Sequence, residues 1–361
     1  MKKIFVQLST SVFERNAIFE KMDINHLNAG WFEMKRRFEE FGYDLVTADD
    51  RSLNDCEGII FFNANSLCLP TPLTRRVGNG IRRFLGRKTI PTYPTRQLYE
   101  EAIAAGLRDK LVLVLWEPKT VLRSNFDSKI WSKFNHILTW DDDLLRYQKF
   151  SRFVIPMEGN KTLEQPVPFK EKKLLVNASF NKYSSYKNEL YVARRQTSAY
   201  FTRHYPADFD LFGLRWNEPV TFWQKLFPFL TPHFSTYRGR AADKLTTFSK
   251  YKFNLCYENT SDAKGYVCDK IFTSFHARSV PVYWGASNIE EYIDPATFVD
   301  RRKFRSDAEL ARFLVNVTET EYNAYLQAAD RFMQSAKYAE FSPENFATPF
   351  LKVLGLNKSL S

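Results

Sequence analysis

The segment that decides the fold runs from Tyr251 to Gly285 and reads YKFNLCYENTSDAKGYVCDKIFTSFHARSVPVYWG. Its apolar runs at Lys252–Tyr257 and Val280–Trp284 are typical of buried strands, and a helical pattern over Cys268–Ala277 lies between them. Polar residues gather where each strand is expected to end. Because ligands bind at the carboxyl ends of strands in open α/β sheets, this layout predicts a nucleotide site. The diphosphate of such a ligand needs fixed positive charge, and its ribose needs a carboxylate.

The same alternation of strands and helices extends through the chain and predicts parallel sheets. In the first half we expect strands at Lys3–Leu8, Tyr43–Thr47, Gly58–Phe62, Leu111–Trp116 and His136–Trp140, and helices at Gly30–Phe41 and Leu98–Gly106. A proline-rich, charged linker over Pro156–Lys173 follows, and then the pattern restarts. Beyond it we expect further strands at Leu174–Ala178 and Phe209–Phe212, and helices at Asn188–Tyr205, Asp307–Val315 and Glu321–Ser335. The restart predicts two Rossmann-like domains, 1–160 and 161–361, that face each other across a cleft.

The charge of the chain indicates which partners to expect. Its 361 residues carry a net charge of +11, which favours polyanions such as nucleotide diphosphates, acidic glycolipids or an anionic membrane surface. The basic residues are scattered, and no helix-turn-helix, zinc-finger or RNA-binding signature is present, so no nucleic-acid partner is expected.

The cysteines and the N-terminus point to a reducing compartment. Cys56, Cys68, Cys256 and Cys268 form no Cys-x-x-Cys pair and lie in or beside apolar stretches, so they are expected to be buried free thiols. The N-terminal apolar run is interrupted too early for a signal peptide and reads as a strand. No run approaches the roughly 18–20 apolar residues that span a bilayer. We therefore expect a cytoplasmic protein.

One segment suggests contact with a membrane all the same. Phe222–Phe234 is unusually apolar for a connection and precedes Arg238 and Arg240. It could dip into a membrane surface, at the inner membrane in this interpretation. The alternative is a loop that packs on the core, which the proline breaks favour.

The residues at the start of the Cys268–Ala277 helix suit a phosphate. Helix N-termini present free amides and a positive dipole, and Lys270 adds a full charge for a diphosphate leaving group. Asp269 could accept hydrogen bonds from vicinal ribose hydroxyls. Taken without their surroundings, the two residues favour a capping carboxylate beside a solvated lysine.

The surroundings closely resemble the donor-binding motif of the family 10 α1,3/4-fucosyltransferases. The family pattern is Tyr-Lys-Phe, a few residues, Glu-Asn, a short loop, and Tyr-x-x-Glu-Lys. This chain supplies Tyr251-Lys252-Phe253, Glu258-Asn259 and Tyr266-Val267-Cys268-Asp269-Lys270. The following Val-Pro-Val-Tyr-Trp-Gly also resembles the family. One departure is clear: the family's glutamate is here Asp269, which keeps the charge but reaches one methylene less far.

The resemblance implies a fold of the GT-B type and a bacterial-type enzyme that uses GDP-fucose. It places Asn259 and Tyr266 near the guanine or the ribose, with Glu258 beside them. Asp269 would bind the ribose or the fucose, and Lys270 the diphosphate. The acceptor would bind mainly to the N-terminal domain and the donor to the C-terminal one.

A second cation for the diphosphate is expected from the first helix of the C-terminal domain. Arg194, Arg195 and Lys187 compete for this role, and Arg195 is slightly favoured. Adjacent helical residues point about 100° apart, so only one arginine should face the site. Arg238 and Lys244 could extend the basic lining.

Inverting transfer also needs a base for the acceptor hydroxyl. Glu117 follows the strand Leu111–Trp116, and a half-buried position there would raise its pKa. A carboxylate in a salt bridge is the alternative. Asp141-Asp142-Asp143 resembles a metal-binding Asp-x-Asp motif, but it also suits a helix N-terminus. We therefore expect no metal site and no required cofactor, with a divalent ion at most stimulatory.

The sequence thus predicts an inverting glycosyltransferase that moves L-fucose from GDP-fucose to an acceptor oligosaccharide or glycolipid. An α1,3 linkage to N-acetylglucosamine in a surface glycan or lipopolysaccharide is expected from the resemblance. Two alternatives stay open: a related GT-B transferase with another nucleotide sugar, and an inactive glycan-binding protein.

Overall fold

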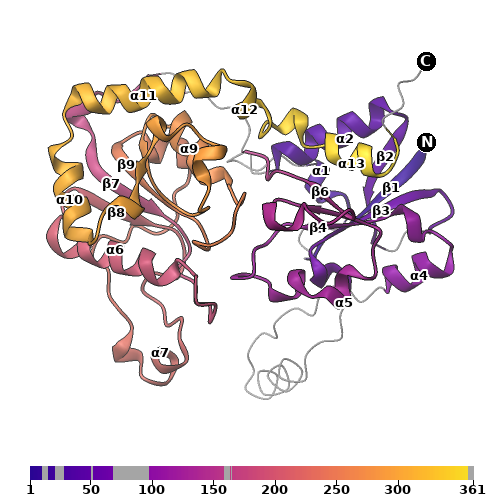
Figure 1. The fold of residues 1–361 in the computed structure, drawn as a ribbon. Coiled ribbons are helices and arrows are strands. Elements are labelled where there is room, and N and C mark those ends of the chain that lie inside the picture. The colour runs from indigo at the N-terminus through magenta and orange to yellow at the C-terminus, as the bar shows by residue number, and fades with distance from the viewer. Residues whose placement is uncertain are drawn as a thin grey trace. The chain divides into compact units, whose positions relative to one another are not determined.

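The computed structural model describes residues 1–9, 15–20, 28–49, 52–67, 97–157, 163 and 165–356. The chain divides into two compact units, each with its own sheet (Figure 1). Unit 1 comprises residues 1–22, 31–153 and 347–361, and unit 2 comprises residues 23–30 and 154–346.

Within its described residues, unit 1 is built on a parallel sheet of six strands in the order β2-β1-β3-β4-β5-β6. The strands are β1 (Lys2–Gln7), β2 (Tyr43–Thr47), β3 (Cys56–Phe62), β4 (Leu111–Leu115), β5 (His136–Thr139) and β6 (Phe150–Arg152). The helices are α1 (Ala17–Glu20), α2 (Ala29–Glu40), α4 (Leu98–Ala104), α5 (Ser128–Trp131) and α13 (Thr348–Val353). The central strand β4 reads LVLVL and is buried along its whole length, as expected for a parallel strand covered on both faces.

Helix α13, the last one described, belongs to unit 1, although it follows unit 2 in the chain. Phe350 of α13 is fully buried, and its ring centre lies 5.9 Å from that of Phe62 and 6.0 Å from that of Phe153. The boundaries predicted from the sequence, 1–160 and 161–361, assign this helix to the other domain. A helix of six residues has too little periodicity to show which sheet it covers.

Unit 2 repeats the architecture and has, in the part that the structure describes, five parallel strands in the order β11-β10-β9-β7-β8. They are β7 (Lys173–Ala178), β8 (Phe209–Phe212), β9 (Tyr251–Tyr257), β10 (Val280–Trp284) and β11 (Val299–Asp300). The main helices are α6 (Tyr191–His204), α7 (Phe222–Leu226), α8 (Lys244–Phe248), α9 (Asp269–His276), α10 (Asp307–Asn316), α11 (Glu319–Met333) and α12 (Ala336–Ala339). The predicted fold class, two parallel α/β domains, is confirmed.

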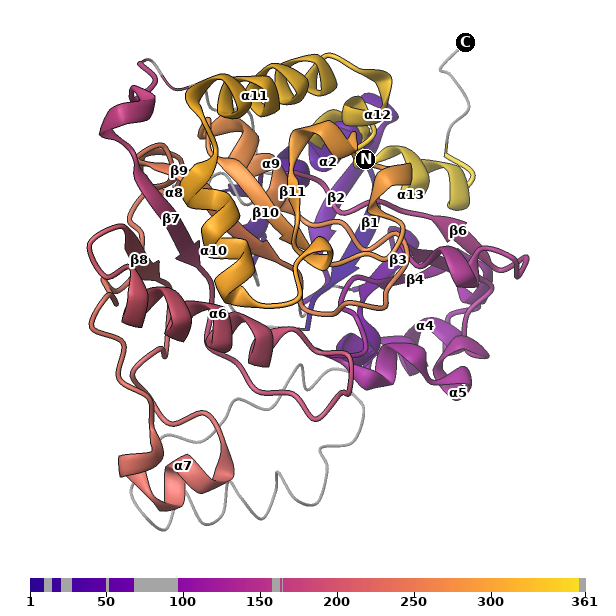
Figure 2. The same ribbon diagram turned by 60° about the vertical axis from the view of Figure 1, so that its left-hand side comes forward.

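The strands of unit 2 are apolar on both faces because helices cover both. Leu255 and Tyr257 of β9 belong to the core cluster that contains residues of α6 and α10, whereas Cys256 belongs to the cluster that contains Ile271 and Phe275 of α9. Figure 2 shows α6 and α10 side by side. Alternate side chains of β9 therefore face opposite helix layers as far as Tyr257, and polar residues follow the strand.

Several smaller predictions can be compared with this fold. Cys56, Cys256 and Cys268 are buried free thiols, whereas Cys68 lies outside the described residues. In the segment Phe222–Phe234 only Phe234 is buried among the large apolar residues, so the prediction of a core-packed loop is wrong for the rest. Among the described helices, none is long and apolar enough to cross a membrane.

A buried carboxylate joins three elements of unit 2. Asp210 of β8 accepts hydrogen bonds from Lys173 of β7, from Tyr251 of β9 and from Arg238, each at 2.7 Å. Burial alone would raise the pKa of Asp210, but hydrogen bonds from Lys173, Tyr251 and Arg238 bring it below its ordinary value. The ionised carboxylate therefore stabilises the folded state.

We expect Asp210→Asn to lower the free energy of unfolding by about 2–3 kcal/mol, because it removes the charge that three donors share. The folded-state pKa is depressed, so the contribution is complete above the unfolded pKa of about 4 and is lost as the pH falls through the folded pKa. Urea unfolding at pH 7 and at pH 3 measures it. The exposed Asp208→Asn, with the same change of charge, is the control. Equal stability of the two variants at pH 7 would contradict this account.

Candidate functional site

Polar side chains gather at the carboxyl edge of the unit 2 sheet. Glu258 and Asn259 follow β9 directly, and Gly285 follows the neighbouring strand β10. Helix α9 begins next to them, with Cys268 as its N-cap residue and Lys270 in its first turn. Because β9 and β10 are parallel neighbours, their ends share one edge of the sheet.

The centre of this edge is a fully buried carboxylate bound to a lysine and to a helix amide. Glu258 has no exposed surface; its Oε2 lies 2.8 Å from the Nζ of Lys270, and its Oε1 accepts a hydrogen bond of 3.0 Å from the backbone N–H of Cys268. Burial lowers the pKa of Lys270, but the Glu258 carboxylate more than offsets this, so the pKa lies above its ordinary value. The Lys270 side chain is still 28% exposed.

Gly285 makes room for this carboxylate. A Cβ atom at position 285 would lie 2.5 Å from the Cγ of Glu258 and 2.4 Å from the hydroxyl of Tyr283. Such distances are not tolerated in a packed interior. The backbone N–H of Glu258 also donates to the carbonyl of Trp284 at 2.7 Å, so the two strand ends are joined here.

Arg194 of α6 holds the end of β9 from the other side. Its guanidinium is buried and donates to the carbonyls of Tyr257 and Glu258 at 2.7 and 2.6 Å, and to the side-chain oxygen of Asn259 at 3.1 Å. A guanidinium with these three contacts fixes the backbone that carries Glu258 and Asn259. The structure thus places Arg194 as a positioning residue for the strand end.

Two further pairs complete the edge. The side-chain amide of Asn259 donates to the hydroxyl of the buried Tyr266 at 3.1 Å. Asp269 lies 3.5 Å from the Nζ of Lys244, the first residue of α8, and both side chains are 28% exposed. Of the residues predicted from sequence, the structure therefore brings together Glu258, Asn259, Tyr266, Asp269, Lys270, Arg194 and Lys244.

The other predicted cations are placed differently. Arg195 is half-buried and donates to the carbonyl of Lys182 at 2.6 Å, in the loop that follows β7. Lys187 is exposed in the same loop. Arg238 binds Asp210, together with Lys173 and Tyr251, the first residues of β7 and β9. Arg238 is therefore directed to the amino-terminal part of the sheet and is not brought together with Lys270.

One further arginine, which the sequence motifs do not indicate, lies at this edge. Arg301 follows β11; it is mostly buried, pairs with Asp307 at 3.1 Å and lies over the ring of Trp284 at 5.4 Å. Its position could have indicated a site residue, because Arg301 directly follows the strand β11 as Glu258 directly follows β9. No motif drew attention to it.

In unit 1 the predicted base is held by two asparagines. Glu117 is half-buried beyond the end of β4; its N–H donates to the side-chain oxygen of Asn63 at 2.9 Å, and its carbonyl accepts from Asn125 at 2.8 Å. Asn125 also donates to Asn63 at 2.7 Å and is completely buried. The backbone at Glu117 is therefore fixed before any ligand arrives.

Asp141 is a second carboxylate at the same edge of the unit 1 sheet, beyond β5. It accepts a hydrogen bond from the N–H of Asp143 at 3.0 Å and so caps the short helix that follows. Asp141 therefore lies at a helix N-terminus, the alternative to a metal-binding motif that the sequence left open. Burial raises the pKa of Asp141 to about 6, so it is only partly protonated at neutral pH.

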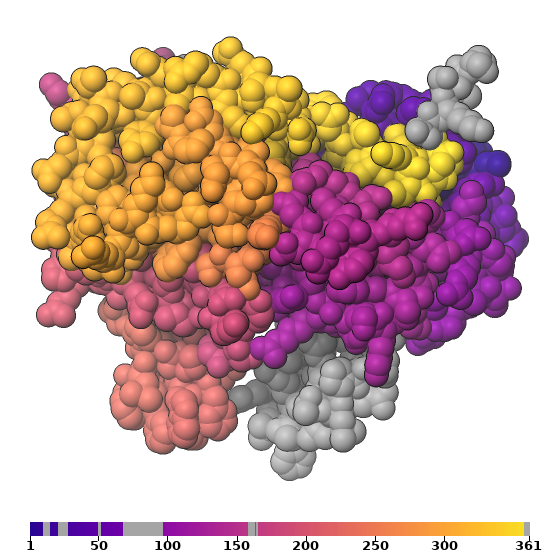
Figure 3. All heavy atoms as spheres, in the orientation of Figure 1, coloured from indigo at the N-terminus to yellow at the C-terminus, as the bar shows by residue number. Residues whose placement is uncertain are grey.

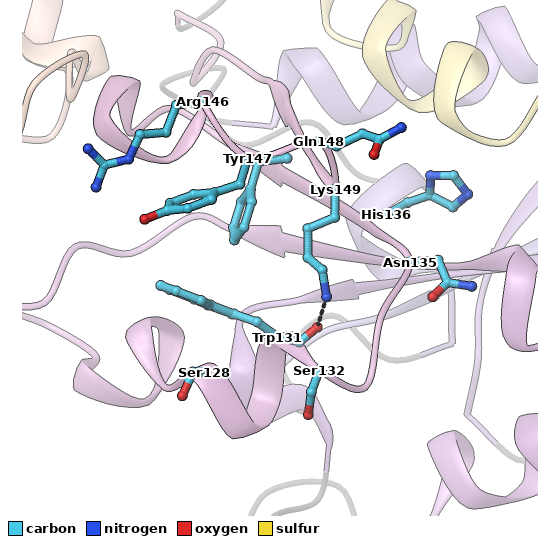
Figure 4. A pocket seen from close by; sticks show the side chains of 10 residues that line it. Ser128, Trp131, Ser132, Asn135, His136, Arg146, Tyr147, Gln148 and Lys149 are labelled. Atoms are coloured by element: carbon cyan, nitrogen blue, oxygen red, sulfur yellow. Dashed lines mark hydrogen bonds between the residues drawn. The ribbon is translucent and has the colours of Figure 1, made fainter.

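Unit 1 also has an open cavity of about 810 Å³, lined by Trp131, Tyr147 and Lys149 among others. Figure 4 shows the Lys149 ammonium reaching the carbonyl of Trp131. His136, the first residue of β5, lines it too, so the cavity lies at the amino ends of the strands. It is thus separate from the edge that carries Glu117.

Comparison with known proteins agrees with this geometry. Residues 228–348 match the family described as glycosyltransferase family 10 (fucosyltransferase), C-terminal. The chain is 37% identical over 78 residues to the α-(1,3)-fucosyltransferase FucT of Helicobacter pylori, covering 22% of this chain and 16% of that one. It is 39% identical over 82 residues to an α-(1,4)-fucosyltransferase of Arabidopsis thaliana, covering 21% and 20%. The matches thus span a fifth or less of the length of these two relatives.

Solved structures agree over nearly the whole chain. A crystal structure of an α1,3-fucosyltransferase superposes with a TM-score of 0.54 at 16% identity, covering 99% of this chain and 91% of that one. An α-glucosyltransferase bound to UDP-glucose and DNA gives 0.54 at 10% identity, covering 98% and 99%. At these identities the likeness concerns the fold.

The two parallel α/β units define a protein of the GT-B fold class. With the strand-end residues in place and the matching segment around them, the assignment can be narrowed. Residues 228–348 match the C-terminal region of glycosyltransferase family 10, the fucosyltransferase family, and shorter segments of the chain are similar to named fucosyltransferases.

We expect Glu258→Gln to lower the pKa of Lys270, because burial would then oppose its charge without the carboxylate that offsets it. A lower pKa means more neutral amine at pH 9, so Lys270 should react faster with acetic anhydride. Peptide mass spectrometry measures this, with the other lysines as internal standards. The exposed Glu319→Gln should leave the rate at Lys270 unchanged. An unchanged rate in Glu258→Gln as well would show that the pair does not control the lysine.

Proposed function

We propose that the protein transfers L-fucose from GDP-fucose to a hydroxyl of an acceptor glycan, with inversion at the anomeric carbon. The observation that carries the proposal is the Lys270 ammonium at the start of α9, held at the carboxyl edge of the sheet by Glu258. Such an edge is where nucleotide ligands bind in α/β proteins, and a helix N-terminus favours phosphate. The family match covers this segment, and the relatives are named fucosyltransferases.

In the proposed complex the diphosphate contacts Lys270. Asn259 and Tyr266, already bonded to each other, lie at the guanine or ribose, and Asp269 takes the ribose or fucose hydroxyls, with Lys244 beside it. Arg195 is the better second cation, because the guanidinium of Arg194 is already engaged by two backbone carbonyls. Arg195 would have to exchange its bond to the Lys182 carbonyl for a phosphate oxygen. Lys187, exposed in that loop, is the remaining candidate.

The proposed chemistry is a single displacement. Glu117 takes the proton of the acceptor hydroxyl while the acceptor oxygen forms a bond to the anomeric carbon of fucose. The bond from that carbon to the β-phosphate oxygen breaks, and GDP leaves with the electron pair. Lys270 and the arginine stabilise the charge that develops on the diphosphate. No cofactor is needed in this scheme, and a divalent ion would act only as a stimulant.

The acceptor is proposed at the level of its class. An α1,3 linkage to N-acetylglucosamine in a surface glycan or lipopolysaccharide would suit a bacterial-type member at the cytoplasmic face of the inner membrane, in peripheral contact with the lipid. Asp269, in place of the family's glutamate, is the one feature that favours a different nucleotide sugar. A panel of GDP- and UDP-sugars decides the donor. GDP binding without transfer to any acceptor would favour an inactive glycan-binding protein instead.

Lys270→Ala should lower the transfer rate by roughly 10²–10³-fold, because it removes the charge that stabilises the departing diphosphate. A radiolabelled GDP-fucose transfer assay measures the loss, and circular dichroism shows whether the variant is folded. The exposed Lys303→Ala in the same unit should keep full activity. Transfer at the normal rate by folded Lys270→Ala would refute the donor site.

Glu117→Gln should lower the rate by roughly 10²–10⁴-fold while the affinity for GDP stays the same, because a base acts on the acceptor and not on the nucleotide. Transfer kinetics and calorimetry with GDP measure the two effects separately. Asp141→Asn, the carboxylate on the neighbouring strand, is the matched comparison and should have a much smaller effect. The opposite ranking would move the base from the end of β4 to the end of β5.

A further inference from the structure

The surface of unit 2 carries an exposed apolar patch that the proposed catalysis does not use. The patch is formed by α7 and the short helix Pro228–Leu230 that follows it, and it projects from the body of the unit (Figures 1 and 3). Its members are large apolar residues within nine positions: Phe222, Trp223, Leu226, Phe227, Phe229 and Leu230. We call them the apolar tip. Phe229 is 82% exposed, Phe222 70% and Trp223 62%.

The tip is an ordered element. Thr221 and Gln224 form a capping box at the start of α7, in which each side chain satisfies a backbone N–H. The ring centres of Trp223 and Phe227 lie 6.3 Å apart with nearly parallel planes, and Phe229 contacts Phe227 at 5.9 Å. The aromatic side chains therefore pack on one another and still face solvent.

Buried residues anchor the base of the tip in unit 2. Trp216 and Phe234, on either side of the segment, are buried and meet edge to face at 5.3 Å. The N–H of Phe234 also donates to the side chain of Asn217 at 2.9 Å. The exposure of the tip is thus built into the fold, and soluble proteins rarely keep so many large apolar side chains together in water without a use.

The charge around the tip indicates what covers it. From Pro219 to Ala242 the sequence has no acidic residue, and Lys225 and Arg240 are exposed in this stretch. A second copy of this chain, at a net charge of +11, would bring like charges together. An anionic bilayer surface instead attracts lysine and arginine and accepts tryptophan and phenylalanine at the level of its headgroups.

We propose that the apolar tip inserts into the interfacial region of an anionic lipid bilayer and anchors unit 2 to it. The proposal deepens the peripheral contact suggested above, but it depends on residues outside the donor site. It assigns Phe229 and Trp223 to the headgroup–acyl boundary and Lys225 and Arg240 to the anionic headgroups. A transferase held in this way would meet lipid-linked acceptors at the surface where they are displayed.

Co-sedimentation with vesicles of phosphatidylcholine and phosphatidylglycerol tests the proposal. The double variant Trp223→Ser, Phe229→Ser should bind these vesicles at least about tenfold more weakly than the parent protein, because it loses two inserted side chains. Tyr147→Ser, which removes an aromatic residue that is 48% exposed in unit 1, should bind normally. Vesicles of phosphatidylcholine alone should bind the parent protein more weakly, since the charge attraction is missing.

A second measurement does not depend on the stability of the double variant. Lipids brominated in the acyl chain should quench part of the tryptophan fluorescence of the parent protein, and Trp223→Phe should bind equally well but lose that quenching. Unchanged vesicle binding by the double variant overturns the proposal. So does a concentration-dependent dimer that the double variant abolishes, because the tip would then be an interface between copies.

The nucleotide site is tested separately in the same preparations. Calorimetry with GDP in the absence of lipid should give the same affinity for the parent protein and for the double variant. Vesicle binding without GDP binding would remove the proposed function and leave the anchor. GDP binding, together with vesicle binding that is equal for the parent protein and the double variant, would leave the proposed function and remove the anchor.

Discussion

The interaction on which the candidate site depends is the buried ion pair between Glu258 and Lys270. A carboxylate without exposed surface would be strongly unfavourable without partners, and it has two: the ammonium and the Cys268 amide at the start of α9. The pair therefore joins the end of β9 to the first turn of α9. Gly285 leaves space for the Glu258 side chain, and Arg194 holds the backbone carbonyl of Glu258.

Much of the fold could be predicted from the sequence, because parallel strands covered on both faces are continuous apolar runs. The pattern at Lys252–Tyr257 matches β9, and Cys268–Ala277 matches α9 within one residue at each end. The predicted helix Asn188–Tyr205 is less accurate, because α6 begins only at Tyr191. In the loop before it, Glu189 accepts hydrogen bonds from the N–H groups of Tyr191 and Val192, and Asn188 donates to Asp262, which is distant in the sequence. Helix propensity alone does not show these bonds.

The site was predictable where a motif and a strand end coincide, as at Glu258 and Lys270. It was less predictable where long side chains choose between partners. Arg194 and Arg195 are equivalent in the sequence, yet one is buried against carbonyls and the other is half-exposed. Arg238 was expected in the basic lining, but it pairs with Asp210 of β8, 28 residues earlier in the chain. Such pairings depend on register between strands, which composition and spacing do not contain.

The position of α13 has a consequence for biosynthesis. Phe350 packs against Phe62 and Phe153, so the first unit lacks part of its interior until α13 has left the ribosome. Unit 2 consists of residues 154–346 and the short segment 23–30, so all of its residues are translated before α13. The half that is translated first would thus be finished last, and loss of α13 would leave it, and not its neighbour, open to proteolysis.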